Sequence, residues 1–283
     1  MYTYYNLIAD VKNLEKMGAK IENIGKTVAG VSIPSIHIGD YSPNQIIIQG
    51  AIHAREYITS ELIVRQAYHT ITRYGSTFKG GIYFVPMINI DGVALCQYGL
   101  SAVPVLKRSF LTDVNGGSTN FTLWKANINA VDLNTNFNAR WGTGTQNIKY
   151  PAPANYIGPY PESEPETRAL VELTNRIKAT LTISYHAEGQ EIYWEFYQVD
   201  PEKSRDKKIG EEFAKITNYK LIDGTLGSAG GYKDWCIEKL KMPAYTFEII
   251  PSSVSFPIPS SALIPEWSKN KDIPYEALNL ILV

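Results

Sequence analysis

The sequence predicts a single α/β domain, residues 1–283, built on a mostly parallel sheet with helices on both faces. Strand-like apolar runs alternate with segments of helical periodicity along the whole chain, a pattern typical of sheets that are covered on both sides. Hydrophobic residues make up 44% of the chain and charged residues 19%, a globular composition that supports a large core. No linker, internal repeat or charge block divides the chain, so we expect one domain.

Two helices are predicted in the first part of the chain. Residues 5–17 have apolar side chains at helical spacing, and Gly18 is suited to cap the end of this helix. Thr59 or Ser60 can cap a second helix that runs to Tyr74. Short apolar runs between turn residues predict strands over residues 31–39, 45–49 and 82–88.

A long loop region is predicted over residues 100–160, which are rich in Gly, Asn, Thr and Pro. Long loops in compact domains usually carry function. Ordered structure returns at residues 163–166, where Ser-Glu-Pro-Glu predicts a capping box that opens a helix. The patterns that follow predict strands at 180–185, 190–197 and 244–249, and helices near 202–217, 230–240 and 274–282.

Charge and hydropathy narrow the range of partners. Lys plus Arg is 27 and Asp plus Glu is 28, so the formal charge is 27 − 28 = −1, which favours neither nucleic acid nor an anionic membrane. No run of apolar residues is long enough for a membrane helix, and the first ten residues lack the features of a signal peptide. We therefore expect a cytoplasmic protein, with release from a spore or as a lysin as the alternative. Cys96 and Cys236 are too few for a disulfide scaffold or a cysteine-based zinc site.

The histidines point to a metal site. His53 and His186 each follow a predicted apolar strand, so both are expected at the carboxyl edge of the sheet, where open parallel sheets bind ligands. Glu56 lies three residues after His53, and catalytic zinc needs three such N and O ligands with one position open. On spacing alone, a surface histidine and a salt-bridged glutamate explain the His-x-x-Glu pair equally well. His37 and His69 are expected to be structural or solvated.

Several motifs in order resemble the carboxypeptidase A-type zinc metallopeptidases. The segment that carries His53 and Glu56 resembles the zinc signature of that family, and the gap to the third ligand, 186 − 56 = 130, suits it. The further matches are Val85–Gly92, Val131–Asn134, Tyr160–Thr167 and Thr246–Glu248. The resemblance implies one zinc ion per chain and a single α/β domain with a mixed, largely parallel sheet of about eight strands.

The same resemblance implies roles for individual residues. It makes His53, Glu56 and His186 the zinc ligands and Glu248 the general base. It places Lys125 where most members have an arginine that faces the oxyanion, and Asp132 as the carboxylate that orients the first zinc histidine. Arg55 and Asn134 would contact substrate, although an exposed salt bridge explains Arg55 almost as well and a solvated loop lysine competes for Lys125.

Two departures from the family pattern bear on the substrate. Thr135 replaces the arginine that clamps a C-terminal carboxylate in the family, and Leu226 replaces its mobile tyrosine. Both changes weaken the interpretation as a conventional carboxypeptidase. We estimate the loss of a desolvated bidentate contact at about 2–5 kcal/mol.

A second, more specific resemblance suggests the substrate. The segments 124–127, 186–194 and 230–235 look like those of bacterial γ-D-glutamyl-diaminopimelate peptidases, which cut peptidoglycan stem peptides. This resemblance implies a muropeptide substrate and a role in cell-wall turnover or sporulation, with Lys233 meeting a diaminopimelate carboxylate and Arg140 or Tyr232 assisting. The alternatives are a carboxypeptidase for ordinary peptides and a catalytically silent muropeptide-binding protein. The sequence gives no oligomeric state.

Overall fold

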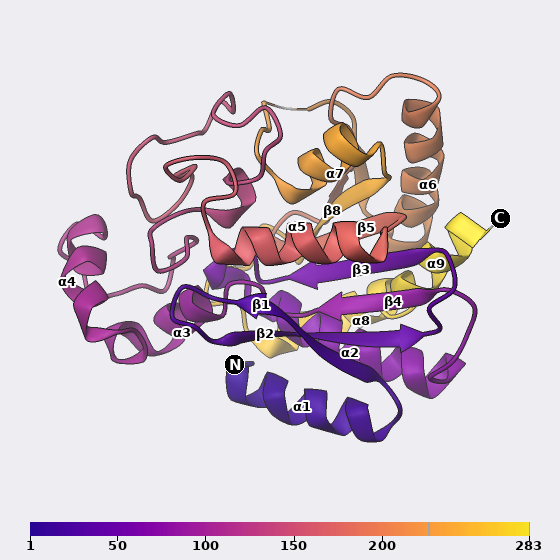
Figure 1. Ribbon diagram of the computed structural model, residues 1–283, viewed down its shortest axis with the longest axis horizontal. Coiled ribbons are helices and arrows are strands. Elements are labelled where there is room, and N and C mark those ends of the chain that lie inside the picture. The colour runs from indigo at the N-terminus through magenta and orange to yellow at the C-terminus, as the bar shows by residue number, and fades with distance from the viewer. Residues whose placement is uncertain (226, 283) are drawn as a thin grey trace.

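The computed structural model describes residues 1–225 and 227–282, and its centre is an eight-stranded sheet (Figure 1). The order of the strands is β1-β2-β4-β3-β5-β8-β6-β7. The strand bounds are Lys20–Lys26 (β1), Ser32–Gly39 (β2), Gln45–Gly50 (β3), Gly81–Val85 (β4), Leu181–Ala187 (β5), Glu191–Tyr193 (β6), Lys220–Ile222 (β7) and Ala244–Ile249 (β8).

The four central strands, β4, β3, β5 and β8, run parallel to one another. Strands β3, β4 and β5 are buried along their whole length, as expected for parallel strands with helices on both faces. Antiparallel pairings bring in β2 at one side of this group and β6 at the other, so the sheet is mixed. The predicted mixed, largely parallel sheet is therefore confirmed.

Helices cover both faces of the sheet (Figure 1). On one face, α2 and α9 contact the central strands, and α1 and α8 pack against α2. On the other face, α5 packs on β1 and α7 packs on β5 and β8. The helix bounds are Tyr4–Lys16 (α1), Ile58–Tyr74 (α2), Ile90–Tyr98 (α3), Val105–Val114 (α4), Pro165–Ile177 (α5), Glu202–Thr217 (α6), Tyr232–Leu240 (α7), Leu263–Asn270 (α8) and Ile273–Leu282 (α9). None of these described helices is long and apolar enough to span a bilayer.

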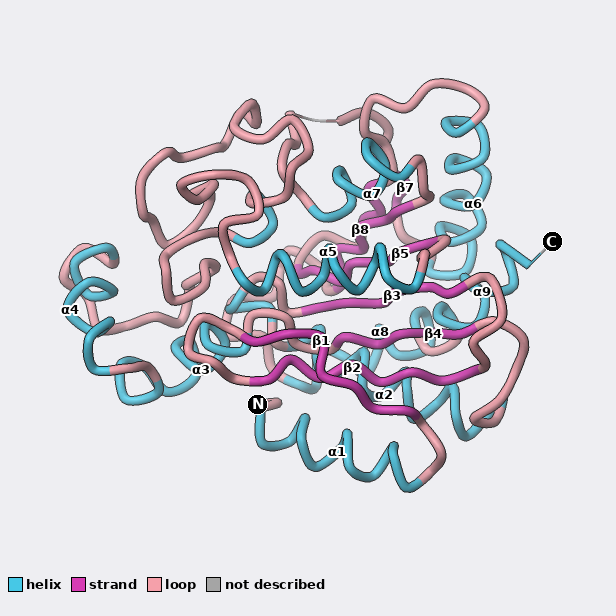
Figure 2. Tube along the Cα trace, viewed as in Figure 1, coloured by secondary structure: helices cyan, strands magenta, loops and turns pink. Residues whose placement is uncertain are grey.

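The predicted loop region was wrong at its start, because α4 lies within it. Helix α3, which lies just before it, was not predicted. Both helices pack around a separate small core that includes Leu95, Leu111 and Trp124. Residues 115–160 do form the long, irregular segment that was predicted, seen as the coiled pink trace in Figure 2. The short amphipathic runs were hidden among Gly, Asn and Thr residues, so the periodicity was too brief to detect. Strand β1 and helix α8 were also missed, because both are too short to give a clear period.

Two predicted helix caps were also wrong. Helix α5 begins after Glu164 without a side-chain cap, and Ser163 instead donates a hydrogen bond to the Glu164 carboxylate (2.8 Å). Helix α2 begins at Ile58, so Thr59 and Ser60 lie inside it. The predicted strand 190–197 is shortened to β6, because the chain turns away after Tyr193.

Candidate metal centre and active site

His53 and Glu56 lie on the short connection between β3 and α2. Gly50 ends β3 directly against Thr59 and Ile63 of α2, and a side chain at this position has no space. The Thr59 hydroxyl accepts a hydrogen bond from the Ala51 amide (2.8 Å) and donates one to the Glu56 carbonyl (2.8 Å). These contacts fix the turn, so that His53 Nδ1 lies 2.9 Å from Glu56 Oε1 and both side chains are buried.

His186 comes to the same point from the end of β5, the neighbouring strand. Its Nδ1 atom lies 3.0 Å from Glu56 Oε2 and 3.1 Å from His53 Nδ1. The two imidazole rings meet edge to face at 69°, with their centroids 4.6 Å apart. Parallel pairing of β3 with β5 is what brings residues 133 positions apart into contact.

This donor set fits a zinc ion. One atom each from His53, Glu56 and His186 can be chosen so that all three lie within 4.8 Å of one another. Zinc bound tetrahedrally to two imidazoles at 2.0–2.1 Å would separate the two nitrogens by about 3.3 Å, close to the 3.1 Å between the Nδ1 atoms here. Two nitrogens and a carboxylate, with space on the cavity side, match a catalytic rather than a structural site.

Asp132 fixes the orientation of the first imidazole. Its Oδ1 atom lies 3.2 Å from His53 Nε2, on the opposite side of the ring from Glu56. The same carboxylate accepts the amides of Asn134 (3.1 Å) and Asn155 (3.0 Å). Burial works against ionisation, but the charge and hydrogen bond of His53 prevail and hold the pKa of Asp132 below its usual range. This carboxylate therefore keeps His53 Nδ1 directed at Glu56.

Glu248 on β8 stands beside the metal-ligand group. In the register of the sheet it is paired directly with His186, and its side chain lines the cavity next to His53. Loss of hydration, followed by the negative charge of Glu56, raises the pKa of Glu248 to about 8. Lys125 lines the same space, and its carbonyl accepts the Ala54 amide (3.0 Å), which ties its loop to the turn between His53 and Glu56.

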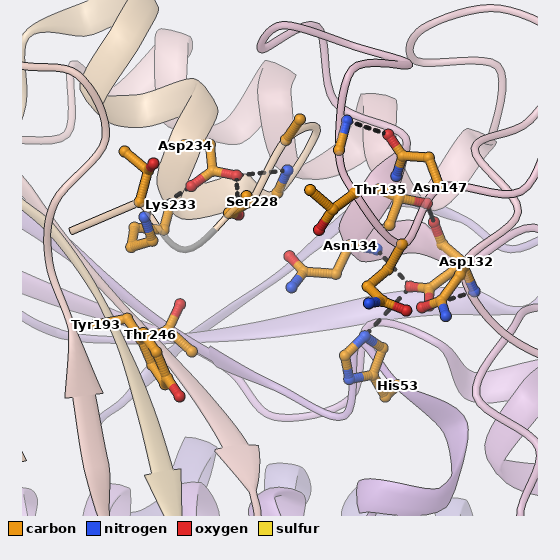
Figure 3. A pocket seen from close by; sticks show the side chains of 18 of the residues that line it. His53, Asp132, Asn134, Thr135, Asn147, Tyr193, Ser228, Lys233, Asp234 and Thr246 are labelled. Carbon is orange, nitrogen blue, oxygen red and sulfur yellow. Dashed lines mark hydrogen bonds and ion pairs between the residues drawn. The ribbon is translucent and has the colours of Figure 1, made fainter. Parts of the chain in front are cut away.

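A cavity of about 340 Å³ extends from this centre (Figure 3). His53 and Asp132 lie at one end, and Lys233, Asp234 and Ser228 lie at the other. Gly230 has a positive φ of 80° and lies so close to the Thr135 carbonyl that no side chain fits. At this contact the loop before α7 packs directly on the turn that carries Asn134 and Thr135. The packed loop and turn form one wall of the cavity.

Three predicted substrate-binding residues lie elsewhere. Tyr232 is buried in the core, where its hydroxyl lies 2.7 Å from that of Thr174, and this contradicts a side-chain contact with substrate. Arg140 stacks on Tyr197 with 3.7 Å between the guanidinium carbon and the ring centroid, in a separate surface hollow. Arg55 packs over the ring of Phe256 and is not among the cavity residues. The position of Leu226, predicted to replace a tyrosine, lies outside the described residues.

The structure adds residues that the motifs did not assign. Asp234 was aligned but was given no role, although it directly follows Lys233 and its side chain lines the cavity. Asn155 and Glu195 also line it, from segments where no periodic pattern singles them out. The only sequence signal for Asp234 was its place in the motif at residues 230–235.

A metal-ligand group at the carboxyl edge of the sheet, beside a carboxylate and a peptide-sized cavity, defines a metal-dependent hydrolase. The zinc carboxypeptidase family model matches residues 4–273. The chain belongs to this family, and it is a zinc metallopeptidase.

Individual relatives share most of the chain. A γ-D-glutamyl-L-diamino acid endopeptidase 1 from Lysinibacillus sphaericus is 34% identical over 275 residues, 92% of this chain and 68% of the relative. Carboxypeptidase B from Rattus norvegicus is 28% identical over 250 residues, 80% of this chain and 57% of the relative. The chain thus spans roughly two thirds or less of these proteins.

Solved structures share the fold. Bovine thrombin-activatable fibrinolysis inhibitor, in complex with a tick carboxypeptidase inhibitor, superposes with a TM-score of 0.77 at 20% identity, covering 99% of this chain and 97% of the other. A murein-tripeptide amidase from Escherichia coli O157 gives 0.59 at 22% identity, with 92% and 91% coverage. These similarities confirm the predicted architecture.

Proposed function

We propose that this zinc metallopeptidase hydrolyses the bond between γ-D-glutamate and diaminopimelate in peptidoglycan stem peptides. The proposal depends on Thr135, which by the motif resemblance stands where conventional carboxypeptidases have the arginine that clamps the substrate carboxylate. Its hydroxyl lies within hydrogen-bonding distance of the carbonyls of Asp132 (2.9 Å) and Tyr156 (3.2 Å), and a threonine offers substrate no positive charge. The names of the Lysinibacillus relative and of the murein-tripeptide amidase point to the same class of substrate.

In this proposal His53, Glu56 and His186 hold the zinc ion. When bound, zinc supplies electrophilic assistance to the scissile carbonyl and to the attacking water. Asp132 accepts the Nε2 proton of His53 in a hydrogen bond and so keeps the Nδ1 lone pair free for the metal.

Glu248 and Lys125 take part in the bond change itself. Glu248 removes a proton from the attacking water as the new C–O bond forms, and it delivers that proton to the diaminopimelate nitrogen as the C–N bond breaks. The Lys125 ammonium lies on the cavity side, where it stabilises the negative charge that develops on the carbonyl oxygen.

A carboxypeptidase for ordinary α-peptides is the second candidate, because carboxypeptidase B is among the relatives. The cavity argues against it. Among the described lining residues the lysines are Lys125 and Lys233, and neither occupies the position of the family's clamp. An ordinary C-terminal carboxylate would then lack a bidentate partner, which we estimate to cost about 2–5 kcal/mol.

The test is mass spectrometry of the products from defined tri-, tetra- and pentapeptide stems, with an ordinary α-peptide that has a free C-terminus as the comparison. The proposal expects cleavage after γ-D-glutamate, loss of that activity on chelation and its return with zinc. Release of C-terminal residues from the α-peptide alone would support the carboxypeptidase. Binding of stem peptides without turnover by the zinc-loaded protein would support a silent binding protein. A role in cell-wall turnover or sporulation stays a prediction from this substrate.

A further inference from the structure

Asn89 joins two segments of the active site that come from different parts of the chain. It lies directly before α3 and is fully buried, and its side-chain nitrogen Nδ2 faces three backbone carbonyls. One belongs to Ile52 (3.2 Å), the residue before the metal ligand His53. The other two belong to Lys125 (3.4 Å) and Ala126 (3.1 Å). One amide therefore bridges the turn of the metal ligands and the loop that carries Lys125.

The other polar groups of Asn89 hold its side chain in this position. The side-chain oxygen Oδ1 accepts the backbone N–H of Gly92 (3.1 Å) and so caps the first turn of α3. The backbone N–H of Asn89 donates to the carbonyl of Ala51 (3.1 Å), just after β3. Gly92 has no room for a side chain, because a Cβ there would lie 2.7 Å from the Ala126 carbonyl oxygen and closer still to Asn89 Oδ1. Helix α3 thus begins in direct contact with the loop of Lys125.

Lys125 depends on such contacts for its place in the site. It lies outside any helix or strand, so no regular hydrogen-bond ladder fixes its backbone. Its carbonyl accepts the Ala54 amide (3.0 Å) as well as the side chain of Asn89, and its own N–H donates to the Pro153 carbonyl (3.0 Å). A lysine side chain is flexible and ends in a point charge, so the place of its ammonium follows the place of its backbone. Small displacements of a catalytic group are costly for the rate.

We propose that Asn89 is a positioning residue for Lys125, and that its amide sets the distance between the lysine ammonium and the metal centre. Asn89 is not among the residues that line the cavity, so it acts through Lys125 and not on the substrate. The inference rests on the proposed function, in which Lys125 stabilises the charge on the carbonyl oxygen. It also gives a role to the motif Val85–Gly92, which supplies no metal ligand and no cavity residue.

The first variant is Asn89→Ser, which removes the bridging amide and keeps a hydroxyl that can accept the Gly92 N–H as a helix cap. We expect kcat to fall by about 10- to 100-fold, because the lysine ammonium is misplaced in the transition state. The KM of the peptide and the zinc content should stay as in the unmodified enzyme. Asn270→Ser is the matched control, since this buried asparagine joins the Tyr219 hydroxyl (2.9 Å) to the Glu266 carbonyl (3.0 Å) on the opposite face of the sheet. It should keep kcat.

A double-mutant cycle separates positioning of Lys125 from a general structural role. Lys125→Met alone should lower kcat by about 10²–10³-fold, and adding Asn89→Ser should then lower it by no more than about twofold further. The proposal would be wrong if Asn89→Ser lowered kcat by the same factor with and without Lys125, or left kcat of the otherwise unmodified enzyme unchanged. Gly92→Ala is a second variant in case Asn89→Ser does not fold. Its methyl group presses on the Ala126 carbonyl and should show the same dependence on Lys125.

The choice of peptide separates this inference from the proposed function. The cycle is measured with L-Ala-γ-D-Glu-meso-diaminopimelate and, in parallel, with an ordinary α-peptide that has a free C-terminus. Cleavage of the α-peptide alone would refute the proposed bond specificity, and a Lys125-dependent loss in Asn89→Ser on that peptide would still support the positioning role. Cleavage of the stem peptide with equal losses in both backgrounds would refute the positioning role alone. Cleavage of neither peptide by the zinc-loaded enzyme would refute both.

Discussion

His186 and Glu248 are directly paired residues of the neighbouring parallel strands β5 and β8. Paired residues of adjacent strands direct their side chains to the same face of the sheet. The imidazole of His186, a metal ligand, and the carboxylate of Glu248 therefore lie on the same face of the sheet, although they are 248 − 186 = 62 positions apart in the sequence, and Glu248 also lines the cavity. This register is the reason why Glu248 lies beside the metal-ligand group, where we propose that it acts as the base.

The first prediction is that Glu248→Gln abolishes turnover without removing the metal. The amide has the shape of the carboxylate but cannot accept the proton of water, so kcat should fall by about 10²–10⁴-fold or more. Zinc content, measured by atomic absorption, should stay at one ion per chain. The exposed Glu15→Gln on α1 is the control and should behave as the unmodified enzyme. Retained turnover would exclude Glu248 as the base.

The second prediction concerns Asp132. Asp132→Asn should weaken zinc affinity by about 10- to 100-fold, because an amide no longer orients and polarises His53 as the carboxylate does. Competition with a chromogenic chelator measures the affinity. Asp113→Asn, on the exposed surface of α4, should leave it unchanged. An unaltered affinity in Asp132→Asn would show that its contact with His53 is only structural.

The third prediction restores the missing clamp. Thr135→Arg places a guanidinium at the cavity wall and should raise kcat/KM for peptides with a free C-terminal carboxylate relative to the same peptides as amides. A gain of about tenfold in this ratio corresponds to 1.4 kcal/mol of differential binding. Thr143→Arg, outside the cavity, is the control. If the ratio did not change, Thr135 would not lie at the carboxylate position.

The fourth prediction is a pH dependence of stability from Glu166 of α5. Burial, together with the charges of Asp91 and Glu164, raises the pKa of Glu166 to about 7 from an ordinary 4.5. The folded state thus favours the protonated form of Glu166. The contribution of Glu166 to the free energy of unfolding is therefore complete below pH 4.5 and is lost as the pH rises through 7. A pKa of about 7 in place of 4.5 corresponds to about 3 kcal/mol in the free energy of unfolding.

Glu166→Gln, which mimics the protonated form, should therefore stabilise the protein at pH 8 and have little effect near pH 4.5. Urea unfolding at both pH values measures the difference. The exposed Glu172→Gln of the same helix should show no such pH-dependent gain. A Glu166→Gln variant that is equally destabilised at both pH values would contradict the raised pKa.

The sequence by itself determined the alternation of strands and helices and the types of ligand at the metal centre. Apolar periodicity is a local property, so the strands β2 to β5 and β8 and most long helices were visible in it. The metal ligands could be identified because His53 and His186 each follow a strand, and Glu56 lies three residues after His53. Parallel strands end at the same edge of the sheet.

Only the tertiary structure decided which side chains share the cavity. Tyr232 and Lys233 are adjacent in the sequence, yet successive positions on a helix point about 100° apart, so one enters the core and the other the cavity. The packing of α7 on β5 and β8 likewise decides that Lys233 forms an ion pair with Asp234. It also decides that Arg140 lies in a separate surface hollow. Side-chain direction and long-range packing are not local properties, and a linear pattern of residue types does not contain them.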